Sequence, residues 1–276
     1  MLIAQITDTH IKGEGVLAYG RIETSGFLAR AVDHILHLET RPDVVLATGD
    51  LVDAGSPAEY ARLRHLLAPL PMPVYLIPGN HDDRDALRAT FADRRYMPSE
   101  GFIQYVVDDG PLRLIAIDTL IPGAPGGRVD RERLAWLDAR LGEAPSKPTA
   151  IFMHHPPFKT AIDFMDGIGL DGADEMAEIV RRHPQVERVL CGHLHRSIQA
   201  RWAGTLAMTA PATAHKVGLD VQRENGLSVT LEPPGYALHL WRPDIGLVSH
   251  VANVGDFLSY RVIPPGTRDL ARSGRA

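Results

Sequence analysis

Short hydrophobic runs rich in β-branched residues alternate with amphipathic stretches along the first two thirds of the chain, and this alternation constrains the fold most. It predicts an α/β layered architecture in which helices separate buried strands. From about residue 199 onward, helical periodicity fades and short extended runs take over. We expect buried strands at Leu2–Ile6, Val44–Thr48, Val74–Pro78, Leu112–Asp118, Ala150–Met153 and Val186–Cys191.

Helices are predicted between these strands from apolar spacing and from capping residues. The stretch Ile22–Leu38 places its apolar side chains on one face at helical spacing, and Pro57 is well suited to open the next helix. Asp130 is a predicted N-cap, and Asp171 is predicted to cap a helix that ends near His183.

A cluster of metal-binding side chains follows most of the predicted strands. Loops at the carboxyl ends of strands in open α/β sheets converge on one crevice, so residues far apart in sequence can meet there. No fold needs these side chains in this arrangement, whereas a pair of adjacent metal ions does, which indicates a hydrolase. The clusters are Asp8-Thr9-His10, Gly49-Asp50, Gly79-Asn80-His81-Asp82, His154-His155-Pro156 and Gly192-His193-Leu194-His195.

The donor types predict how the ions are held. Asp8 and His10 flank a single residue, so in an extended conformation both side chains project to the same side. Asp50 follows Gly49, which allows a tight turn, and its two carboxylate oxygens suit a bridge between cations. We expect Asp8, His10, Asp50 and His195 around one ion and Asp50, Asn80, His154 and His193 around the other.

Mixed nitrogen and oxygen ligands without thiolate favour Zn, Mn, Fe or Co over calcium. The sequence does not choose among these four metals. The expected cofactor is therefore two divalent metal ions of one of these kinds.

These motifs resemble those of the calcineurin-like binuclear metallophosphoesterases, whose pattern is D-x-H, G-D, G-N-H-[DE], H and G-H-x-H. The match runs in order from Asp8 to His195. The compact length, the Met-His-His-Pro-Pro form and the β-rich tail are most similar to the bacterial class III cyclic-nucleotide and glycerophosphodiester phosphodiesterases. The resemblance implies an α/β/β/α four-layer sandwich with a β-rich C-terminal cap or hairpin, which relatives often use in dimer contacts.

The resemblance, together with the polar Pro/Gly/Arg-rich composition of the last residues, predicts a domain organisation, and the family pattern implies a choice between adjacent histidines. We expect a catalytic domain over residues 1–200, a β-rich cap or dimerisation region completing the fold over 201–263, and a disordered tail over 264–276. The tail after residue 199 can complete a second sheet, cover the crevice or pair with another subunit. Because the family ligand lies two residues before proline, His154 is the expected ligand and His155 a supporting residue.

The mechanism implied by the family is attack on phosphorus by a hydroxide that bridges the metals. Two adjacent cations lower the pKa of a bound water from 15.7 to about 7 and neutralise charge on the phosphoryl oxygens. His81, next to the ligand Asn80, is expected to bind the phosphoryl group or protonate the leaving alkoxide, with Asp82 orienting it. His215 is the candidate for a further substrate contact.

Composition narrows the partners. A net charge of -5 without a long basic run argues against nucleic acid polymers. No signal peptide or membrane span is evident and Cys191 is the lone cysteine, so we expect a cytoplasmic protein, as a homodimer or higher homo-oligomer. Because only Arg196 and Lys216 accompany the motifs, small phosphodiesters are the expected substrates. The alternatives are a phosphomonoesterase and a non-catalytic metal-binding scaffold.

Overall fold

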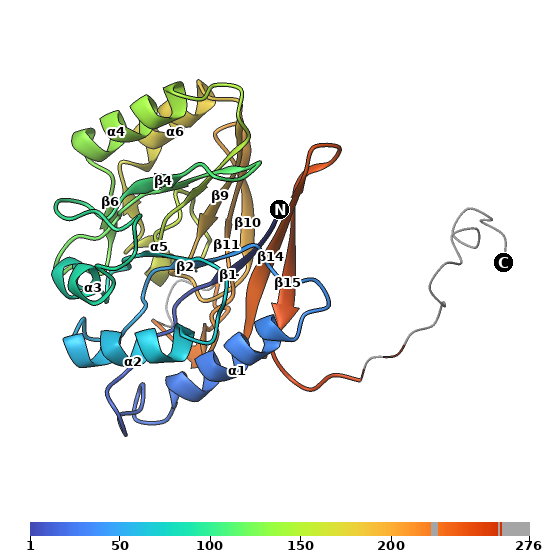
Figure 1. Ribbon diagram of the computed structural model, residues 1–276. Helices are drawn as coiled ribbons and strands as arrows, with labels where there is room; N and C mark the ends of the chain where they lie inside the picture. The colour runs from blue at the N-terminus through green and yellow to red at the C-terminus, as the bar shows by residue number, and fades with distance from the viewer. Residues whose placement is uncertain (222–225, 259, 261–276) are drawn as a thin grey trace.

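The structure is a computed structural model that describes residues 1–221, 226–258 and 260, and its two large β-sheets pack face to face between helices (Figure 1). In the first sheet the strands lie in the order β15-β14-β1-β2-β3. Strands β1, β2 and β3 run parallel, and the antiparallel hairpin β14–β15 pairs with β1. Their bounds are β1 Leu2–Ile6, β2 Val44–Thr48, β3 Val74–Ile77, β14 Gly235–Arg242 and β15 Gly246–Asn253.

The second sheet has the order β10-β11-β9-β7-β5-β4, in which β5, β7, β9 and β11 are parallel. Two short pairs, β6 with β8 and β12 with β13, lie outside the large sheets. The bounds are β4 Tyr105–Val107, β5 Arg113–Ala116, β6 Gly127–Arg128, β7 Thr149–Phe152, β8 Leu170–Asp171, β9 Val186–Cys191, β10 Ile198–Trp202, β11 Thr205–Thr209, β12 Lys216–Val217 and β13 Val229–Thr230.

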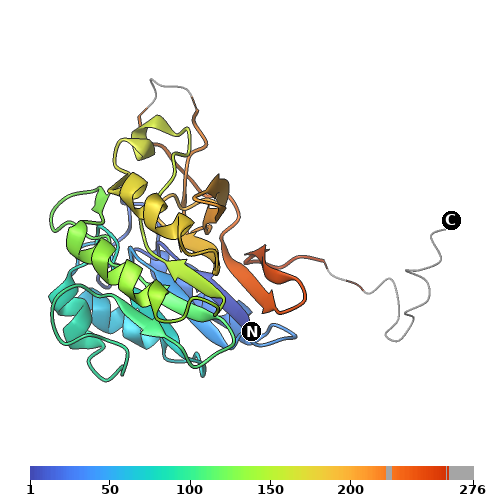
Figure 2. The same ribbon diagram turned by 90° about the horizontal axis from the view of Figure 1, so that it is seen from above.

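Helices cover the outer face of each sheet, so the predicted four-layer α/β/β/α sandwich is confirmed. Helices α1 and α2 lie below the first sheet in Figure 1, and α4 and α6 lie side by side over the second (Figures 1 and 2). The bounds are α1 Thr24–Leu36, α2 Pro57–Leu67, α3 Arg84–Thr90, α4 Arg131–Gly142, α5 Asp163–Asp166 and α6 Ala173–Arg181.

Capping residues define the helix starts, with one correction to the sequence prediction. Asp130 caps α4 as predicted, accepting a hydrogen bond from the Arg133 backbone. The prediction that Asp171 caps α6 is wrong, because Gly172 occupies that position with φ +85°. A Cβ there would lie 2.2 Å from the Val129 carbonyl oxygen, so only glycine fits this left-handed turn.

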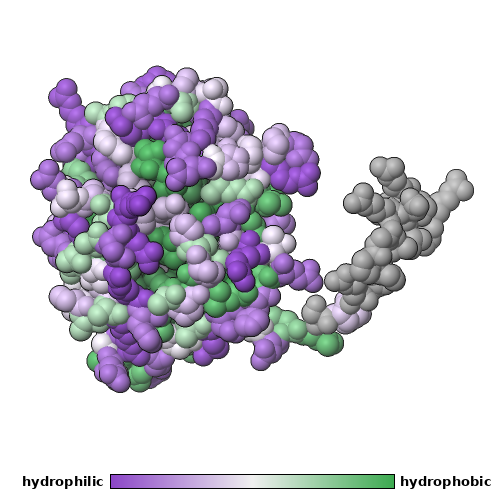
Figure 3. Space-filling model, viewed as in Figure 1, coloured by the Kyte–Doolittle hydropathy of each residue, from purple (hydrophilic) through white to green (hydrophobic). Residues whose placement is uncertain are grey.

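Side chains along a strand point alternately to the two faces of its sheet, so each strand contributes to two separate hydrophobic clusters. Leu114 and Ala116 belong to the cluster between the sheets, whereas Ile115 and Ile117 pack with α4 and α6. Figure 3 shows hydrophilic side chains over most of the visible face, with smaller hydrophobic patches among them.

The chain beyond residue 200 is built into the sandwich. β14–β15 extends the first sheet and β10–β11 the second, while β12–β13 forms a small separate pair. The predicted disordered tail, residues 264–276, lies outside the described residues. Among the described helices, none has the length and apolar character needed to cross a membrane.

Candidate metal centre

The predicted ligands meet where the parallel strands of both sheets end. The loops after β1 and β2 are joined by backbone hydrogen bonds from Asp8 N to the Gly49 carbonyl (3.0 Å) and from His10 N to the Asp50 carbonyl (2.9 Å). Across the sandwich, Gly192 N donates to the His154 carbonyl (3.0 Å), which joins the loops after β7 and β9. Loops from the two sheets therefore enclose one site.

Most of the predicted ligands have an unusual backbone. Positive φ is uncommon for residues other than glycine, costs about 1–3 kcal/mol each, and clusters at functional sites. The sequence prediction assumed an extended backbone at Asp8 and His10, and this assumption is wrong. Both side chains nevertheless reach the same site. The ligands with positive φ are Asp8 (51°), His10 (41°), Asp50 (46°), His193 (70°) and His195 (53°).

One ligand group is compact. Asp8, His10, Asp50 and His195 each offer one ligand atom, and these atoms all lie within 4.8 Å of one another. His195 Nε2 lies 3.2 Å from His10 Nε2 and 3.4 Å from Asp8 Oδ1. All four residues are buried. This is the set predicted for the first ion.

Asp50 lies between this group and a second one. Its Oδ2 is 3.6 Å from His10 Nε2 on one side and 3.3 Å from His154 Nε2 on the other. His154 Nε2 also lies 3.2 Å from Asn80 Oδ1. The carboxylate is therefore placed where a ligand shared by two cations has to be.

The ring orientations in the second group fit a cation. His154 Nδ1 donates to the Thr48 carbonyl (2.8 Å), so the Nε2 lone pair of the neutral ring faces the oxygens of Asp50 and Asn80. His193 Nε2 donates to the Ile168 carbonyl (3.1 Å), which leaves the Nδ1 lone pair buried with no partner among the described residues. Histidines that bind metals usually donate their other ring N–H to such an acceptor.

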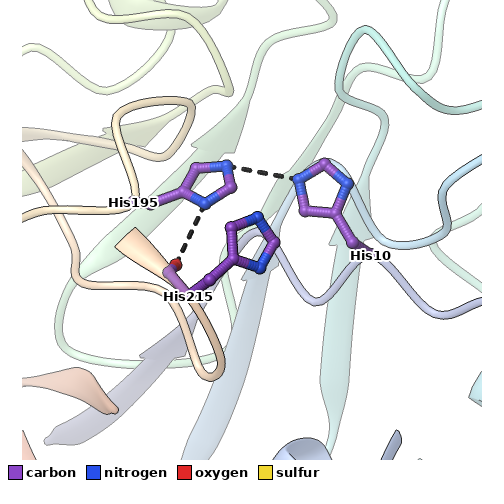
Figure 4. A group of neighbouring side chains, drawn as sticks. All are labelled: His10, His195 and His215. Carbon is purple, nitrogen blue, oxygen red and sulfur yellow. Dashed lines mark hydrogen bonds between the residues drawn. The ribbon is translucent and has the colours of Figure 1, made fainter. Parts of the chain in front are cut away.

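The first group repeats this arrangement. His195 Nδ1 donates to the His215 carbonyl (3.1 Å), and His10 Nδ1 lies 3.3 Å from Asp53 Oδ1. The Nε2 atoms of the two rings then face each other at 3.2 Å (Figure 4). Neutral rings in this arrangement would repel, and a cation held by both removes the repulsion. The residues present therefore fit a pair of divalent cations.

Electrostatics agree with this view. Burial alone would lower the pKa of His154, but the carboxylate of Asp50 raises it to about 9. Burial raises the pKa of Asp8 to about 6, against the attraction of His154. Without a cation the His154 ring holds a second proton at neutral pH, and metal binding releases it.

Motif glycines leave room for the ligands. A Cβ on Gly49 would lie 2.4 Å from His154 Nδ1, and one on Gly192 would lie 2.1 Å from Thr7 Oγ1. Gly49 also has φ +89°, in the region that favours glycine. The sequence prediction that Gly49 permits a tight turn agrees with this geometry.

His81 lies at the mouth of the site and is oriented by the loop after β2. Its backbone N donates to Asp50 Oδ1 (2.9 Å), and its Nδ1 donates to the Asp53 carbonyl (2.9 Å). The Asp53 carboxylate lies beside His10 and also pairs with Lys12. Asp53 therefore contacts both histidines.

Asp82 is placed differently from the prediction that it orients His81. Its carboxylate is buried and accepts hydrogen bonds from Tyr60 Oη (2.8 Å) and from the backbone of the metal loops. Asp82 therefore fixes the loop backbone. The His81 ring is oriented instead by the backbone carbonyl of Asp53. The backbone donors to Asp82 are Gly79 N (2.8 Å), Leu51 N (3.0 Å) and Val52 N (3.3 Å).

His155 is buried behind the centre. Its Nδ1 lies 2.8 Å from Thr119 Oγ1 and its Nε2 lies 3.2 Å from the Pro125 carbonyl. Both nitrogens thus have partners outside the ligand groups, which fits the supporting position expected for it. Thr119 follows β5 and had no signal in the sequence.

His215 completes a cluster of three imidazoles at the mouth. Its ring centroid lies 4.7 Å from that of His195 and 5.3 Å from that of His10 (Figure 4). The ring is buried, and neither nitrogen has a partner among the described residues. Burial lowers its pKa to about 3, so a neutral ring faces the site.

A cavity of about 250 Å³ opens over the ligands. Aromatic and aliphatic side chains that the sequence did not single out form its outer wall. None of the described residues lining it is a lysine or arginine. The apolar lining residues are Tyr19, Pro125, Phe164, Met165, Ile168, Val217, Leu227 and Val229.

A family model described as calcineurin-like phosphoesterase matches residues 1–197, which include every predicted metal ligand. The chain belongs to the calcineurin-like phosphoesterase family. The resemblance seen in the motifs is thereby confirmed.

Curated relatives share most of the length of this calcineurin-like phosphoesterase. A probable glycerophosphodiester phosphodiesterase of Arcobacter nitrofigilis is 35% identical over 258 residues, covering 93% of this chain and 94% of the relative. A probable cyclic nucleotide phosphodiesterase of Rhodopseudomonas palustris is 36% identical, with 86% and 87% covered. Among solved structures, a dimetal phosphatase from Danio rerio aligns with a TM-score of 0.65 at 15% identity, covering 92% of this chain and 99% of that one, which supports the fold.

Proposed function

We propose that this protein is a phosphodiesterase that uses two divalent cations to hydrolyse small phosphodiesters, such as glycerophosphodiesters or cyclic nucleotides. The observation that carries the proposal is the convergence of imidazole lone pairs and buried carboxylate oxygens from both sheets around Asp50. Relatives named as phosphodiesterases of these substrates, 35% and 36% identical over most of the chain, support the choice of reaction.

In this proposal the side chains form two ligand groups that share Asp50. When bound, the cations supply an activated water and neutralise charge on the phosphoryl group. The metal could be Mn, Fe, Zn or Co, which all suit these donors. The first group is Asp8, His10, Asp50 and His195, and the second is Asp50, Asn80, His154 and His193.

Two histidines outside the ligand groups are placed for the substrate. His81 is fixed through Nδ1 to the Asp53 carbonyl, so Nε2 is left for the phosphoryl group or the leaving alkoxide. Protonated, it can donate to the alkoxide. Neither ring nitrogen of His215 has a partner in the part of the chain that the structure describes, and at the same cavity the ring would bind a phosphoryl oxygen through its N–H.

The charge of the cavity favours diesters over the alternative, monoesters. A monoester carries one more negative charge and normally needs additional cationic contacts. The described lining of the cavity has no lysine or arginine. Arg196, one of the basic residues near the motifs, is paired with Glu232 (3.1 Å) and the Val217 carbonyl (2.8 Å).

The test combines metal content with turnover. Protein loaded with Mn²⁺ or Zn²⁺ is assayed by mass spectrometry and by steady-state rates with bis(p-nitrophenyl) phosphate, glycerophosphocholine, cyclic AMP and p-nitrophenyl phosphate. We expect two ions per chain and higher kcat/KM for diesters. Two bound ions without turnover of any ester would support the scaffold alternative. Faster hydrolysis of the monoester would overturn the diester assignment.

The predicted organisation of the protein forms part of the same proposal. We propose residues 1–200 as the catalytic domain and 201–263 as the region that completes the fold and forms a homodimer or higher homo-oligomer in the cytoplasm. The eight-residue edge strand β15, on which the Val251 side chain is 44% exposed, supports pairing between copies. Light scattering coupled to size exclusion tests it, and a monomer at all concentrations would exclude it.

A further inference from the structure

A polar side chain, Gln5 of β1, is fully buried between the sheets. Its neighbours on the strand are apolar, and Ile3 on the same face belongs to the hydrophobic core. An amide buried without its hydrogen bonds costs about 1–3 kcal/mol, whereas an apolar side chain has no such requirement. The contacts of this amide therefore need an explanation beyond packing.

The Gln5 amide joins both sheets. Its Nε2 donates to Thr48 Oγ1 (2.9 Å) at the end of β2 and to the Cys191 carbonyl (2.9 Å) at the end of β9. Its Oε1 lies 3.0 Å from His239 Nε2 in β14. A single side chain thus connects β1, β2 and β14 of the first sheet with β9 of the second.

His239 fixes the orientation of this amide. Because Gln5 Oε1 accepts, His239 Nε2 carries the proton, and its Nδ1 accepts from Ser249 Oγ (2.8 Å). The ring is fully buried, and burial lowers its pKa to about 3, so it is neutral at physiological pH. The amide and the imidazole therefore form a fixed array with every polar atom paired.

Both residues that accept hydrogen bonds from the Gln5 amide lie two positions before a proposed metal ligand. Thr48 precedes Gly49-Asp50, and its carbonyl accepts the hydrogen bond that orients His154 (2.8 Å). Cys191 precedes Gly192-His193, and the Gly192 N donates to the His154 carbonyl (3.0 Å). The amide thus holds the strand ends that lead to Asp50 and His193, and Thr48 in turn orients His154.

We propose that Gln5 is a positioning residue, which His239 orients and which sets the spacing between the ligands of the two sheets. The inference rests on the proposed metal centre and deepens it. Its main effect is on the second cation, because two of the four ligands proposed for that ion, His154 and His193, come from the second sheet, whereas the first ion takes only His195 from it. Spacing errors between rigid sheets are not absorbed by side-chain rotation alone.

The test uses Gln5→Met and the double variant Gln5→Met/His239→Leu. Methionine keeps the length of the side chain and removes its hydrogen bonds. In the double variant both polar partners are replaced, which is often nearly neutral for stability. The polar atoms that remain keep other partners. Thr48 Oγ1 still donates to the Ile6 carbonyl (3.4 Å), and the Cys191 carbonyl still accepts from Ala210 N (2.9 Å). Ser249 Oγ still accepts from Arg188 (3.3 Å).

Mn²⁺ binding is measured by titration calorimetry, and the coupling between two bound Mn²⁺ ions by electron paramagnetic resonance. We expect the affinity for the second ion to fall about 10- to 100-fold in both variants, the effect typical of residues that orient metal ligands. The coupling spectrum should change at full occupancy. We expect the melting temperature to fall in Gln5→Met and to recover in the double variant.

The control is Tyr236→Phe, in the same strand as His239, β14. It removes the hydrogen bond between the Tyr236 hydroxyl and His34 of α1 (2.9 Å). It should lower stability without altering Mn²⁺ affinity. If the double variant regains both its melting temperature and the wild-type affinity for the second ion, Gln5 has only a structural role and the inference is wrong. A wild-type protein that binds fewer than two ions would instead overturn the proposed function, and this inference with it.

Discussion

The Gly79→Ala substitution tests the geometry of the centre most directly, because the backbone at Gly79 has ordinary φ and the effect is purely steric. The new Cβ would lie 2.2 Å from Asp50 Oδ1, 2.3 Å from Asp50 N and 2.8 Å from His154 Nε2. Real Cβ contacts are essentially never below 3.0 Å, so the carboxylate has to move by about 0.8 Å. The backbone N has even less freedom, because it belongs to the loop that holds the ligand.

The expected consequence is large for activity and moderate for stability. Overpacking of this kind costs about 1–3 kcal/mol of folding free energy. A displacement near 1 Å at a reacting centre costs about 100-fold in rate. We therefore expect kcat/KM for bis(p-nitrophenyl) phosphate to fall about 100-fold at saturating Mn²⁺, in protein that still melts cooperatively.

Gly142→Ala is the matched control, because among the described residues no heavy atom beyond its chain neighbours and its own helix backbone lies within 4 Å of the added Cβ at the end of α4. We expect wild-type activity and equal or slightly higher stability, since alanine favours helix over glycine. If Gly79→Ala keeps two ions and a rate within about twofold of wild type, the position assigned to the Asp50 carboxylate is refuted.

The remaining predictions concern ligands, the leaving group and pH. Asp50→Ala should abolish turnover and lower metal content by mass spectrometry, because in the proposed centre both ions share this carboxylate; normal activity would contradict the bridge. His81→Ala should keep both ions but lower kcat, and a loss of metal in this variant would argue against its place at the substrate. Burial holds the pKa of His239 at about 3 in the folded protein, against the ordinary value of 6.5. Below pH 6.5 the unfolded chain therefore binds a proton at His239 that the folded chain does not bind. The free energy of unfolding falls by about 1.4 kcal/mol for each pH unit below that value. In urea unfolding from pH 7 to pH 4, His239→Gln should show a shallower loss of stability than wild type, and parallel curves would refute this linkage.

Several parts of the molecule could be read from local sequence. Leu2–Ile6 and Val44–Thr48 agree with β1 and β2 to the residue, because a buried strand in such a sheet is a short, mainly apolar run followed by polar residues. Asp130 was recognisable as an N-cap for the same kind of reason, since capping depends on a few neighbouring residues. The metal motifs could be recognised as well, because each predicted ligand lies two to four residues after the end of a strand.

Other parts depended on contacts that sequence spacing does not encode. Asp82 and Asp53 are both acidic and near the motifs, but only the packed loops show that Asp82 binds Tyr60 and Asp53 contacts His81. The cap of α6 lies at Gly172 because the carbonyl of Val129, from a distant segment, excludes a side chain there.

The sequence by itself determined the kind of layers and the chemical identity of the ligands, since both follow from short-range periodicity and residue type. The tertiary structure alone decided which lone pairs face each other, which strand completes each sheet, and why Gln5 interrupts an apolar strand. Gln5 meets Cys191 across 186 positions of sequence. Such a contact arises only when the second sheet packs on the first, because its geometry belongs to neither strand alone.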